Sequence, residues 1–242
     1  MQLLVAEPIL KQAKIPRPPK RPRLAIIMVG HNPDSELFVQ VKRVRADEYG
    51  IDTVLIRFPS ETEEYEIRTT IVQANRNSKF TAIIIQLPLP SHIDTEAVIQ
   101  LIDSKKDVDN LTGSNHYVSP MVRAVAALQD FYTIDFSNRR LCVVGMGKLV
   151  GRPIAHWLEA EGHQPVKLDL NTPNKDELIR QADVIFAGTG QKNVINNQNA
   201  RAGQIIFDCS GRDVDFDAVK NTVAALTPPK GAIGPLIVHF LL

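Results

Sequence analysis

The stretch Leu141–Pro153 reads LCVVGMGKLVGRP and places a glycine-rich turn between two regular elements. Its first four residues are apolar, as in a strand that is buried on both faces of a parallel sheet. Gly145 and Gly147 allow a sharp turn and a close approach to a pyrophosphate, which the N-terminus of the following helix attracts. Gly151 allows that helix to pack closely on the strand. The pattern predicts a dinucleotide-binding turn, with an ordinary structural turn as the alternative.

An acidic residue, Asp169, follows the next candidate strand, residues 164–168. A carboxylate at this place in a dinucleotide-binding unit normally accepts the ribose hydroxyls of NAD. The same charge would repel the additional phosphate of NADP. We therefore expect NAD as the cofactor, with NADP use through Lys148 or Lys167 as the alternative. The residues expected to bind the cofactor are Gly145, Met146, Gly147, Lys148, Gly151, Arg152, Asp169 and Gly211.

Composition and charge limit the class of protein. The chain has 242 residues, of which 44% are hydrophobic and 23% charged, as in a soluble protein of one large or two small domains. A formal net charge of +1 gives no general attraction to nucleic acid or to a membrane surface. We find no apolar run of about 20 residues and no signal-peptide core. The expected location is the cytoplasm.

The two cysteines, Cys142 and Cys209, both lie in apolar strand candidates. Two cysteines in such positions are typical of small core residues in a reducing compartment, and not of a disulfide framework. We expect no metal site.

Apolar runs and helical periods alternate along the chain, in the order typical of parallel α/β sheets. The expected strands are residues 24–29, 53–58, 80–87, 141–144, 164–168, 184–187 and 204–208. The expected helices are residues 35–48, 61–75, 94–101, 119–132, 153–160 and 174–181. We predict two α/β domains with a cleft between them. The first covers 1–118 and is completed by 226–242, and the second is a Rossmann-like dinucleotide-binding domain over 119–225.

The segment Lys14–Arg23 is rich in proline and in basic residues, so it cannot form a long helix. We interpret it as a solvated linker, and a tail that contacts anions is the alternative. The apolar residues 231–242 at the C-terminal end are expected to pack back on the first half.

Polar residues in the first half are candidates for chemistry. Phe38 and Lys42 lie four residues apart in one expected helix and therefore share a face. Gln86 ends an apolar strand, at the edge where open α/β sheets bind ligands. The loop KKDVDN at 105–110 adds carboxylates. Taken singly, each has a structural explanation: a solvated lysine, a glutamine that caps a loop, and a surface turn.

Six motifs follow one another in a fixed order. They are residues 29–35 (VGHNPDS), Phe38-x-x-x-Lys42, residues 86–90 (QLPLP), residues 106–109 (KDVD), residues 150–153 (VGRP) and Gly234-Pro235. In this order and spacing they resemble the methylenetetrahydrofolate dehydrogenase/methenyltetrahydrofolate cyclohydrolase family, from about Leu24 to the C-terminus. The resemblance implies oxidation of 5,10-methylenetetrahydrofolate with NAD(P), and hydrolysis of 5,10-methenyltetrahydrofolate to 10-formyltetrahydrofolate. It also implies a homodimer, with a tetrahydrofolate derivative as substrate.

The resemblance assigns roles position by position. Lys42 assists the attack of water on the methenyl carbon and the opening of the five-membered ring. Gln86 hydrogen-bonds near that amine, and Asp109 accepts the donors of the pterin. These three are the expected catalytic residues. The residues expected to bind the substrate are Phe38, Lys42, Gln86, Leu87, Asp109, Gly231, Gly234 and Pro235.

The chain departs from the family pattern around both ligands. Phe38 replaces a usual tyrosine; it can stack on the aminobenzoyl ring but has lost the hydroxyl. Asn110 replaces a usual glycine, Ala232 alters the segment on the folate side, and Asp169-Leu170 replaces His-Ser on the cofactor side. The segment at 115–119 is shorter. A second hypothesis is therefore a degenerate relative that binds folate or dinucleotide without one or both activities. An unrelated dehydrogenase would leave the first-half motifs unexplained.

Overall fold

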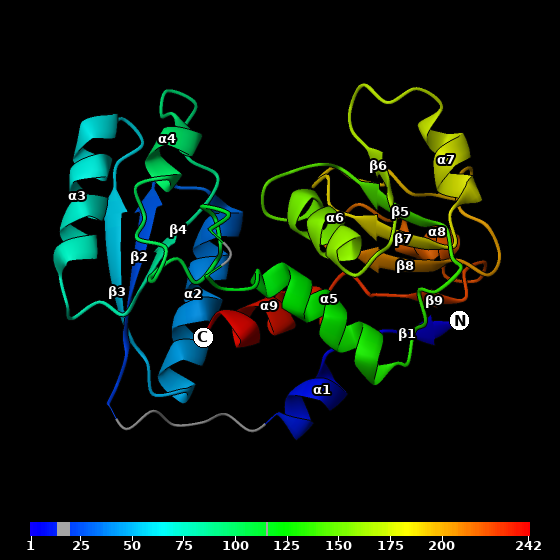
Figure 1. The fold of residues 1–242 in the computed structure, drawn as a ribbon, viewed down its shortest axis with the longest axis horizontal. Coiled ribbons are helices and arrows are strands. Elements are labelled where there is room, and N and C mark those ends of the chain that lie inside the picture. The colour runs from blue at the N-terminus through cyan, green and yellow to red at the C-terminus, as the bar shows by residue number, and fades with distance from the viewer. Residues whose placement is uncertain (14–19, 115) are drawn as a thin grey trace. The chain divides into compact units, whose positions relative to one another are not determined.

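The computed structural model describes residues 1–13, 20–114 and 116–242 (Figure 1). Contacts between Cα atoms divide the chain into two compact units, each built around its own parallel sheet. The three-stranded unit comprises residues 14–120 and 241–242, and the six-stranded unit comprises residues 1–13 and 121–240. The linker expected at Lys14–Arg23 falls mainly on residues 14–19, which lie outside the described residues, as does Asn115 of the shortened loop.

The sheet of the three-stranded unit has the order β3-β2-β4 among the described residues, and all its pairs are parallel. Its strands are β2 (Arg23–Val29), β3 (Asp52–Phe58) and β4 (Ala82–Ile85). β2 is the central strand, and six of its seven residues are buried. This burial on both faces explains why β2 appears in the sequence as an uninterrupted apolar run.

Helices cover both faces of this sheet. α3 (Glu64–Arg76) and α4 (Thr95–Ile99) pack on one face, where Ile71 contributes to the core. α2 (Pro33–Glu48) packs on the other face, together with Leu241 from the C-terminal end. Of the apolar C-terminal residues, only Leu241 and Leu242 belong to this unit.

α2 is the element that carries the first candidate residues. It begins two residues earlier than expected, because Pro33 occupies its first turn and the Asn32 side chain accepts the N–H of Ser35. Ser35 and Lys42 are among its four buried residues, which recur every three or four positions. Lys42 therefore lies on the buried face of the helix.

The six-stranded unit contains a parallel sheet with the order β1-β9-β8-β7-β5-β6 in the described part of the chain. Its strands are β1 (Gln2–Leu3), β5 (Leu141–Val144), β6 (Val166–Leu168), β7 (Val184–Ala187), β8 (Ile205–Asp208) and β9 (Ala225–Leu226). β5, which leads into the glycine-rich turn, is buried at every residue and pairs with β6 and β7. The turn is thus placed at the carboxyl edge of the sheet, where such sheets bind ligands.

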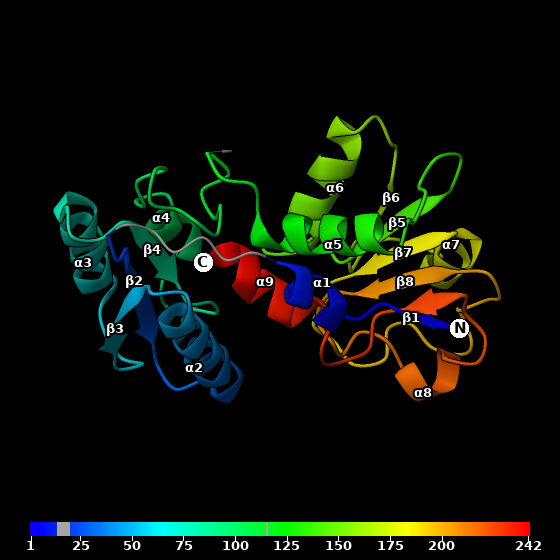
Figure 2. The same cartoon turned by 90° about the horizontal axis from the view of Figure 1, so that it is seen from below.

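Helices also cover both faces of this second sheet; α5 and α6 lie on one side and α8 on the other (Figure 2). The helices are α1 (Glu7–Gln12), α5 (Pro120–Phe131), α6 (Gly151–Ala160), α7 (Lys175–Gln181), α8 (Phe216–Val219) and α9 (Ile233–Leu241). Leu128 of α5 and Leu158 of α6 share one core with Phe207. Ile179 of α7 and Ile206 share the core of the opposite face. This is the Rossmann-like arrangement that the sequence predicts.

The predicted fold class is confirmed, and each expected strand is found within about two residues of its predicted ends or as a shorter piece. β1, β9, α1, α8 and α9 were not expected. The division into units also differs from the expected domains, because residues 1–13 and 226–240 lie in the six-stranded unit. Cys142 and Cys209 are free, buried thiols, as expected. None of the described helices combines the length and apolarity needed to cross a membrane.

Candidate functional site

Three of the expected residues meet in the three-stranded unit. The Lys42 ammonium donates a hydrogen bond of 3.2 Å to Oε1 of Gln86. It also lies 4.0 Å from Oδ2 of Asp109, with the two side chains 7% and 15% exposed. Lys42 comes from α2, Gln86 directly follows β4, and Asp109 lies in the loop 107–112. A largely buried amine is thus held between an amide oxygen and a carboxylate.

Burial dominates the electrostatics of Asp109. Loss of water around the carboxylate raises its pKa above the ordinary value, and the nearby Asp107 adds to this increase. The Lys42 ammonium acts in the opposite direction, because it stabilises the ionised form. The carboxyl therefore exchanges its proton at a higher pH than an exposed aspartate does.

The loop that carries Asp109 is fixed by Asp107, whose role the sequence analysis missed. Asp107 is 1% exposed, and its carboxylate accepts the N–H of Leu111 at 3.0 Å and that of Thr112 at 2.8 Å. The Thr112 hydroxyl donates to the same carboxylate at 2.7 Å. Asn110 has a φ of +53°, in the left-handed region that asparagine tolerates better than most residues. This explains why asparagine can stand where the family pattern has glycine.

Gln86 and Leu87 are held from the opposite side by α2. The Ser35 hydroxyl donates to the Leu87 carbonyl at 3.1 Å, and the Gln86 amide donates to the same oxygen at 2.9 Å. The Gln86 side chain is therefore oriented, so that its oxygen faces Lys42. Phe38, one turn before Lys42, is 41% exposed and leaves an aromatic ring accessible on the same helix. The supporting role of Ser35 was not predicted, since an N-terminal helix serine usually only caps the helix.

The glycine-rich turn of the six-stranded unit requires its glycines. A Cβ on Gly151 would lie 1.8 Å from the carbonyl oxygen of Gly145. Gly145 itself has a φ of +89°, and a Cβ there would lie 2.7 Å from Cγ2 of Thr189. The Gly145 N–H donates to the Leu168 carbonyl at 2.8 Å, which ties the turn to the end of β6. A turn this close to the N-terminus of α6 fits a dinucleotide pyrophosphate.

Asp169 directly follows β6 and is exposed. Its carboxylate accepts the N–H of Asn171 at 2.9 Å and the hydroxyl of Thr172 at 3.0 Å. These hydrogen bonds, that of Thr172 foremost, hold the pKa of Asp169 below its ordinary value. At neutral pH the end of β6 therefore carries a negative charge. Because Leu168 bonds to Gly145, this charge lies next to the glycine-rich turn.

The cations near the turn have other partners. The side chain of Arg152 donates from Nε to the Met146 carbonyl at 3.1 Å. The backbone N–H of Arg152 donates to the Gly147 carbonyl at 3.1 Å. Arg152 thus closes the loop onto the first turn of α6. Lys167 of β6 forms an ion pair with Glu159.

The remaining expected residues of the six-stranded unit lie in loops or in α9. Gly211 has a φ of +75°, and a Cβ there would lie 2.5 Å from the Pro229 carbonyl oxygen. Gly231 precedes α9, and Gly234 and Pro235 lie in its first turn. The Gly231 carbonyl accepts the N–H of Ala6 at 2.9 Å. Gly211 therefore has a packing role whether or not it also contacts a cofactor.

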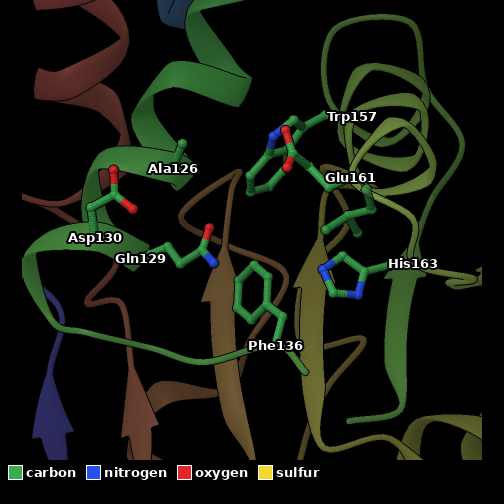
Figure 3. Close-up of a pocket in the computed structure, with 8 residues that line it drawn as sticks. Ala126, Gln129, Asp130, Phe136, Trp157, Glu161 and His163 are labelled. Carbon is green, nitrogen blue, oxygen red and sulfur yellow. The ribbon is translucent and has the colours of Figure 1, made fainter. Parts of the chain in front are cut away.

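A separate pocket of about 310 Å³ lies between α5 and α6 (Figure 3). It is lined by Ala126, Gln129, Asp130, Phe136, Trp157, Leu158, Glu161 and His163. These residues come from the C-terminal half of α5, the C-terminal end of α6 and the loops that follow. Since the glycine-rich turn joins the N-terminus of α6, this pocket lies at the other end of the helix, and none of the expected site residues lines it.

Two family profiles match the chain in succession. The catalytic domain of tetrahydrofolate dehydrogenase/cyclohydrolase matches residues 4–109, and the NAD(P)-binding domain of the same family matches residues 119–242. The first match includes the Lys42–Gln86–Asp109 cluster, and the second includes the glycine-rich turn.

Individual relatives agree with the profiles. The bifunctional protein FolD of Lactobacillus delbrueckii subsp. bulgaricus is 31% identical over 91% of this chain and 84% of its own length. The crystal structure of the bifunctional FolD of Campylobacter jejuni is 27% identical, with a TM-score of 0.82 over 90% of this chain and 84% of that chain. The Trypanosoma brucei FolD, complexed with NADP cofactor and inhibitor, is 26% identical, with a TM-score of 0.83 over 92% and 84%. This chain therefore belongs to the tetrahydrofolate dehydrogenase/cyclohydrolase family.

Proposed function

We propose that this protein oxidises 5,10-methylenetetrahydrofolate with a nicotinamide cofactor and hydrolyses the 5,10-methenyl product to 10-formyltetrahydrofolate. The observation that carries the proposal is the contact of the Lys42 ammonium with Gln86 and Asp109 in the unit that matches the family's catalytic domain. A family assignment alone gives no activity for a divergent chain, because activity depends on the groups at the site. Here the groups with the required chemistry are present and in contact.

Lys42 is proposed to act on the one-carbon bridge. Its ammonium carries three donors and is held by Gln86 and Asp109, so it is oriented before substrate binds. During hydrolysis, water adds to the methenyl carbon and one carbon–nitrogen bond of the five-membered ring breaks. The amine assists by passing a proton between the attacking water and the departing nitrogen. Gln86 keeps the amine in place through this exchange.

Asp109 is proposed to bind the pterin, whose amino group and ring N–H present adjacent donors. An ionised carboxylate accepts both, and such charge-assisted hydrogen bonds are roughly twice as strong as neutral ones. The accessible ring of Phe38 offers a stacking surface for the aminobenzoyl group. Leu87, Gly231, Gly234 and Pro235 complete the proposed substrate-binding set.

The proposed cofactor is NAD. Gly145, Gly147 and Gly151 would hold the pyrophosphate through backbone N–H groups at the N-terminus of α6. The ionised Asp169 next to the turn favours ribose hydroxyls over a ribose phosphate. The ion pair of Lys167 with Glu159 removes one of the two lysines that could favour NADP. The nicotinamide, when bound, accepts the hydride of the dehydrogenase step.

The experiment that tests this function supplies the purified protein with 5,10-methylenetetrahydrofolate and either NAD or NADP. Methenyl and formyl products are followed by absorbance and mass. We expect both products with NAD and a lower kcat/KM with NADP. Folate binding without any product would support the degenerate relative instead, for which the loss of the hydroxyl at Phe38 is the specific motive. A higher kcat/KM with NADP would refute the cofactor assignment alone.

The family resemblance also leads us to propose a cytoplasmic homodimer. Light scattering coupled to size exclusion gives the mass in solution. A single species of about 27 kDa, the monomer mass, would contradict the dimer.

A further inference from the structure

The turn after β7, residues 189–191, packs directly against the glycine-rich turn. A Cβ on Gly145 would lie 2.9 Å from both Cα and N of Thr189. A Cβ on Gly188 would lie 2.1 Å from Cγ1 of Val150. The two turns thus touch at two points with no spare space. Because close-packed groups transmit displacement, the position of the glycine-rich turn depends on that of residues 189–191.

A buried carboxylate holds the second turn in place. Asp213 is fully buried and accepts the N–H of Thr189 at 3.0 Å and that of Gln191 at 3.2 Å. The Thr189 hydroxyl also donates to this carboxylate. A buried charge requires such hydrogen bonds, and each charge-assisted bond is stronger than a neutral one. The carboxylate therefore fixes the turn at both ends.

Asp213 is itself fixed by a second buried carboxylate, Asp208, at the end of β8. Asp208 is 2% exposed and accepts the N–H of Asp213 at 3.4 Å and that of Val214 at 3.2 Å. The backbone N–H of Asp208 donates a hydrogen bond to the Thr227 hydroxyl oxygen at 2.7 Å, which further restricts the position of Asp208. Two carboxylates in series thus connect the end of β8 with the turn after β7.

We propose that Asp213, acting through Thr189, is a positioning residue for the dinucleotide. It holds residues 189–191 against Gly145 and so keeps the glycine-rich turn in its binding conformation before the cofactor arrives. A preorganised turn avoids the cost of ordering on binding, and loss of this contact therefore weakens the dinucleotide complex. The inference rests on the proposed cofactor site. It deepens that proposal by naming a residue that no sequence motif indicates.

Thr189 allows the proposal to be tested without removing a buried charge. Thr189→Val keeps the shape of the side chain and the backbone N–H but removes the hydroxyl that bonds to Asp213. Thr189→Ser keeps the hydroxyl and removes Cγ2, the atom that faces Gly145. We expect Thr189→Val to raise the Kd for NAD about tenfold, the size expected for an unpaired buried acceptor. Thr189→Ser should bind NAD more tightly than Thr189→Val.

Asp215→Asn is the matched control. Asp215 lies two residues from Asp213, and its carboxylate accepts the N–H of Ala218 at 3.2 Å, so it caps α8 and not the turn after β7. This variant loses a carboxylate hydrogen bond in the same segment. Its Tm can fall, but its Kd for NAD should equal that of the unaltered protein. Asp213→Asn, which weakens all three bonds to the turn, should raise the Kd more than Thr189→Val does.

Calorimetric titration with NAD measures each Kd without turnover, and hydrolysis of 5,10-methenyltetrahydrofolate is measured in parallel. A higher Kd and KM for NAD in Thr189→Val, with hydrolysis unchanged, supports the proposal. An equal Kd in Thr189→Val and the unaltered protein overturns it while the cofactor site stands. An equal increase in Asp215→Asn also overturns it, because the effect is then one of general stability. If the unaltered protein binds neither NAD nor NADP, the cofactor site and this inference both fail.

Discussion

Lys42 occupies a position where a charged side chain is expensive unless it is paired. Its ammonium is mostly shielded from water and is compensated by the Asp109 carboxylate and the Gln86 oxygen. Breaking a buried pair costs more than the pair contributes, because the remaining charge is left alone. The buried charges of Lys42 and Asp109 therefore cost folding stability, and the proposed chemistry of the site gives a reason for their presence.

Replacement of Lys42 by methionine should remove hydrolysis of the methenyl compound. Methionine fills a similar volume but cannot move a proton, so the rate should fall about 10²-fold or more. The Kd for NAD should change little, because the glycine-rich turn belongs to the other unit. Single-turnover hydrolysis and calorimetric NAD titration measure the two quantities. Unaltered hydrolysis would remove Lys42 from the mechanism.

Asp109→Asn should change how stability depends on pH. The folded-state pKa of Asp109 is raised, so its contribution to stability is fully present below the unfolded value of about 3.9. That contribution is lost as the pH rises through the raised value, since ionisation in the folded state is disfavoured. The asparagine variant has no such loss. Scanning calorimetry from about pH 4 to about pH 8 should therefore show its Tm rising relative to the unaltered protein. The opposite slope would mean that Lys42 outweighs burial.

At the scale of elements, the proposed cofactor preference depends on one short turn, the turn after β6. The turn after β6 begins with Asp169, whose carboxylate is held within the turn by Asn171 and Thr172. The carboxylate is held by hydrogen bonds from two residues of the same turn, and not by residues of the neighbouring strands. A substitution at Asp169 can therefore change the proposed cofactor preference without altering the fold.

Asp169→Ser should weaken NAD binding and improve that of NADP. The substitution removes the anion that accepts ribose hydroxyls and repels a ribose phosphate. We expect the ratio of the two Kd values to shift by about tenfold or more, which corresponds to the loss of one charge-assisted hydrogen bond. Asp176→Asn is a suitable control, since Asp176 belongs to α7 and bonds to Asn199. Unchanged affinity for both cofactors in Asp169→Ser would mean that this carboxylate does not face the ribose.

The elements also differ in how well the sequence predicts them. β5 and β7 were predicted to the residue, because a strand buried on both faces needs an uninterrupted apolar run. β1 and β9 have two residues each, too few to show any period. They exist because they pair with each other and with β8. Such pairing is a property of the folded chain and leaves no local signal.

The candidate site also combines residues that the sequence indicates with residues that only the fold reveals. Lys42, Gln86 and Asp109 were selected because they match family motifs, and spacing alone gave each of them a structural explanation. Their contact joins residues that lie far apart along the chain. Asp213 was not selected at all, since its partner Thr189 lies 24 residues earlier and neither belongs to a motif. Candidate residues could be selected from the sequence where the proposed chemistry restricts the residue type, whereas supporting residues became visible only in the fold.

At the scale of the whole molecule, the chain has two units with separate cores, and each has apolar clusters on both faces of its sheet. Leu241 is a sensitive point of the three-stranded unit, because it is 5% exposed and packs with Leu24, Ile26 and Ile84. It reaches this core from the opposite end of the chain.

Leu241→Ala should destabilise the three-stranded unit by about 2–5 kcal/mol, the usual cost of a leucine-sized cavity. Hydrogen exchange resolved by peptide gives the readout. Amides of β2 and β4 should exchange faster, whereas those of β5 and β7 should change less, because Leu241 belongs to the core of the three-stranded unit. Leu170→Ala is the control, since Leu170 is 75% exposed. Equal acceleration in both sheets would show that the units open together.

The pairing of β1 with β9 has a consequence for how the protein is made. Gln2 is translated well before its partner Ala225, because the two residues lie far apart along the chain. Leu241, which closes the core of the other unit, is translated later still. Neither unit can bury its full apolar surface before residues 225–241 have been translated, and incomplete cores are prone to aggregation. Apolar side chains of both cores therefore stay accessible to other molecules until residues 225–241 have been added to the growing chain.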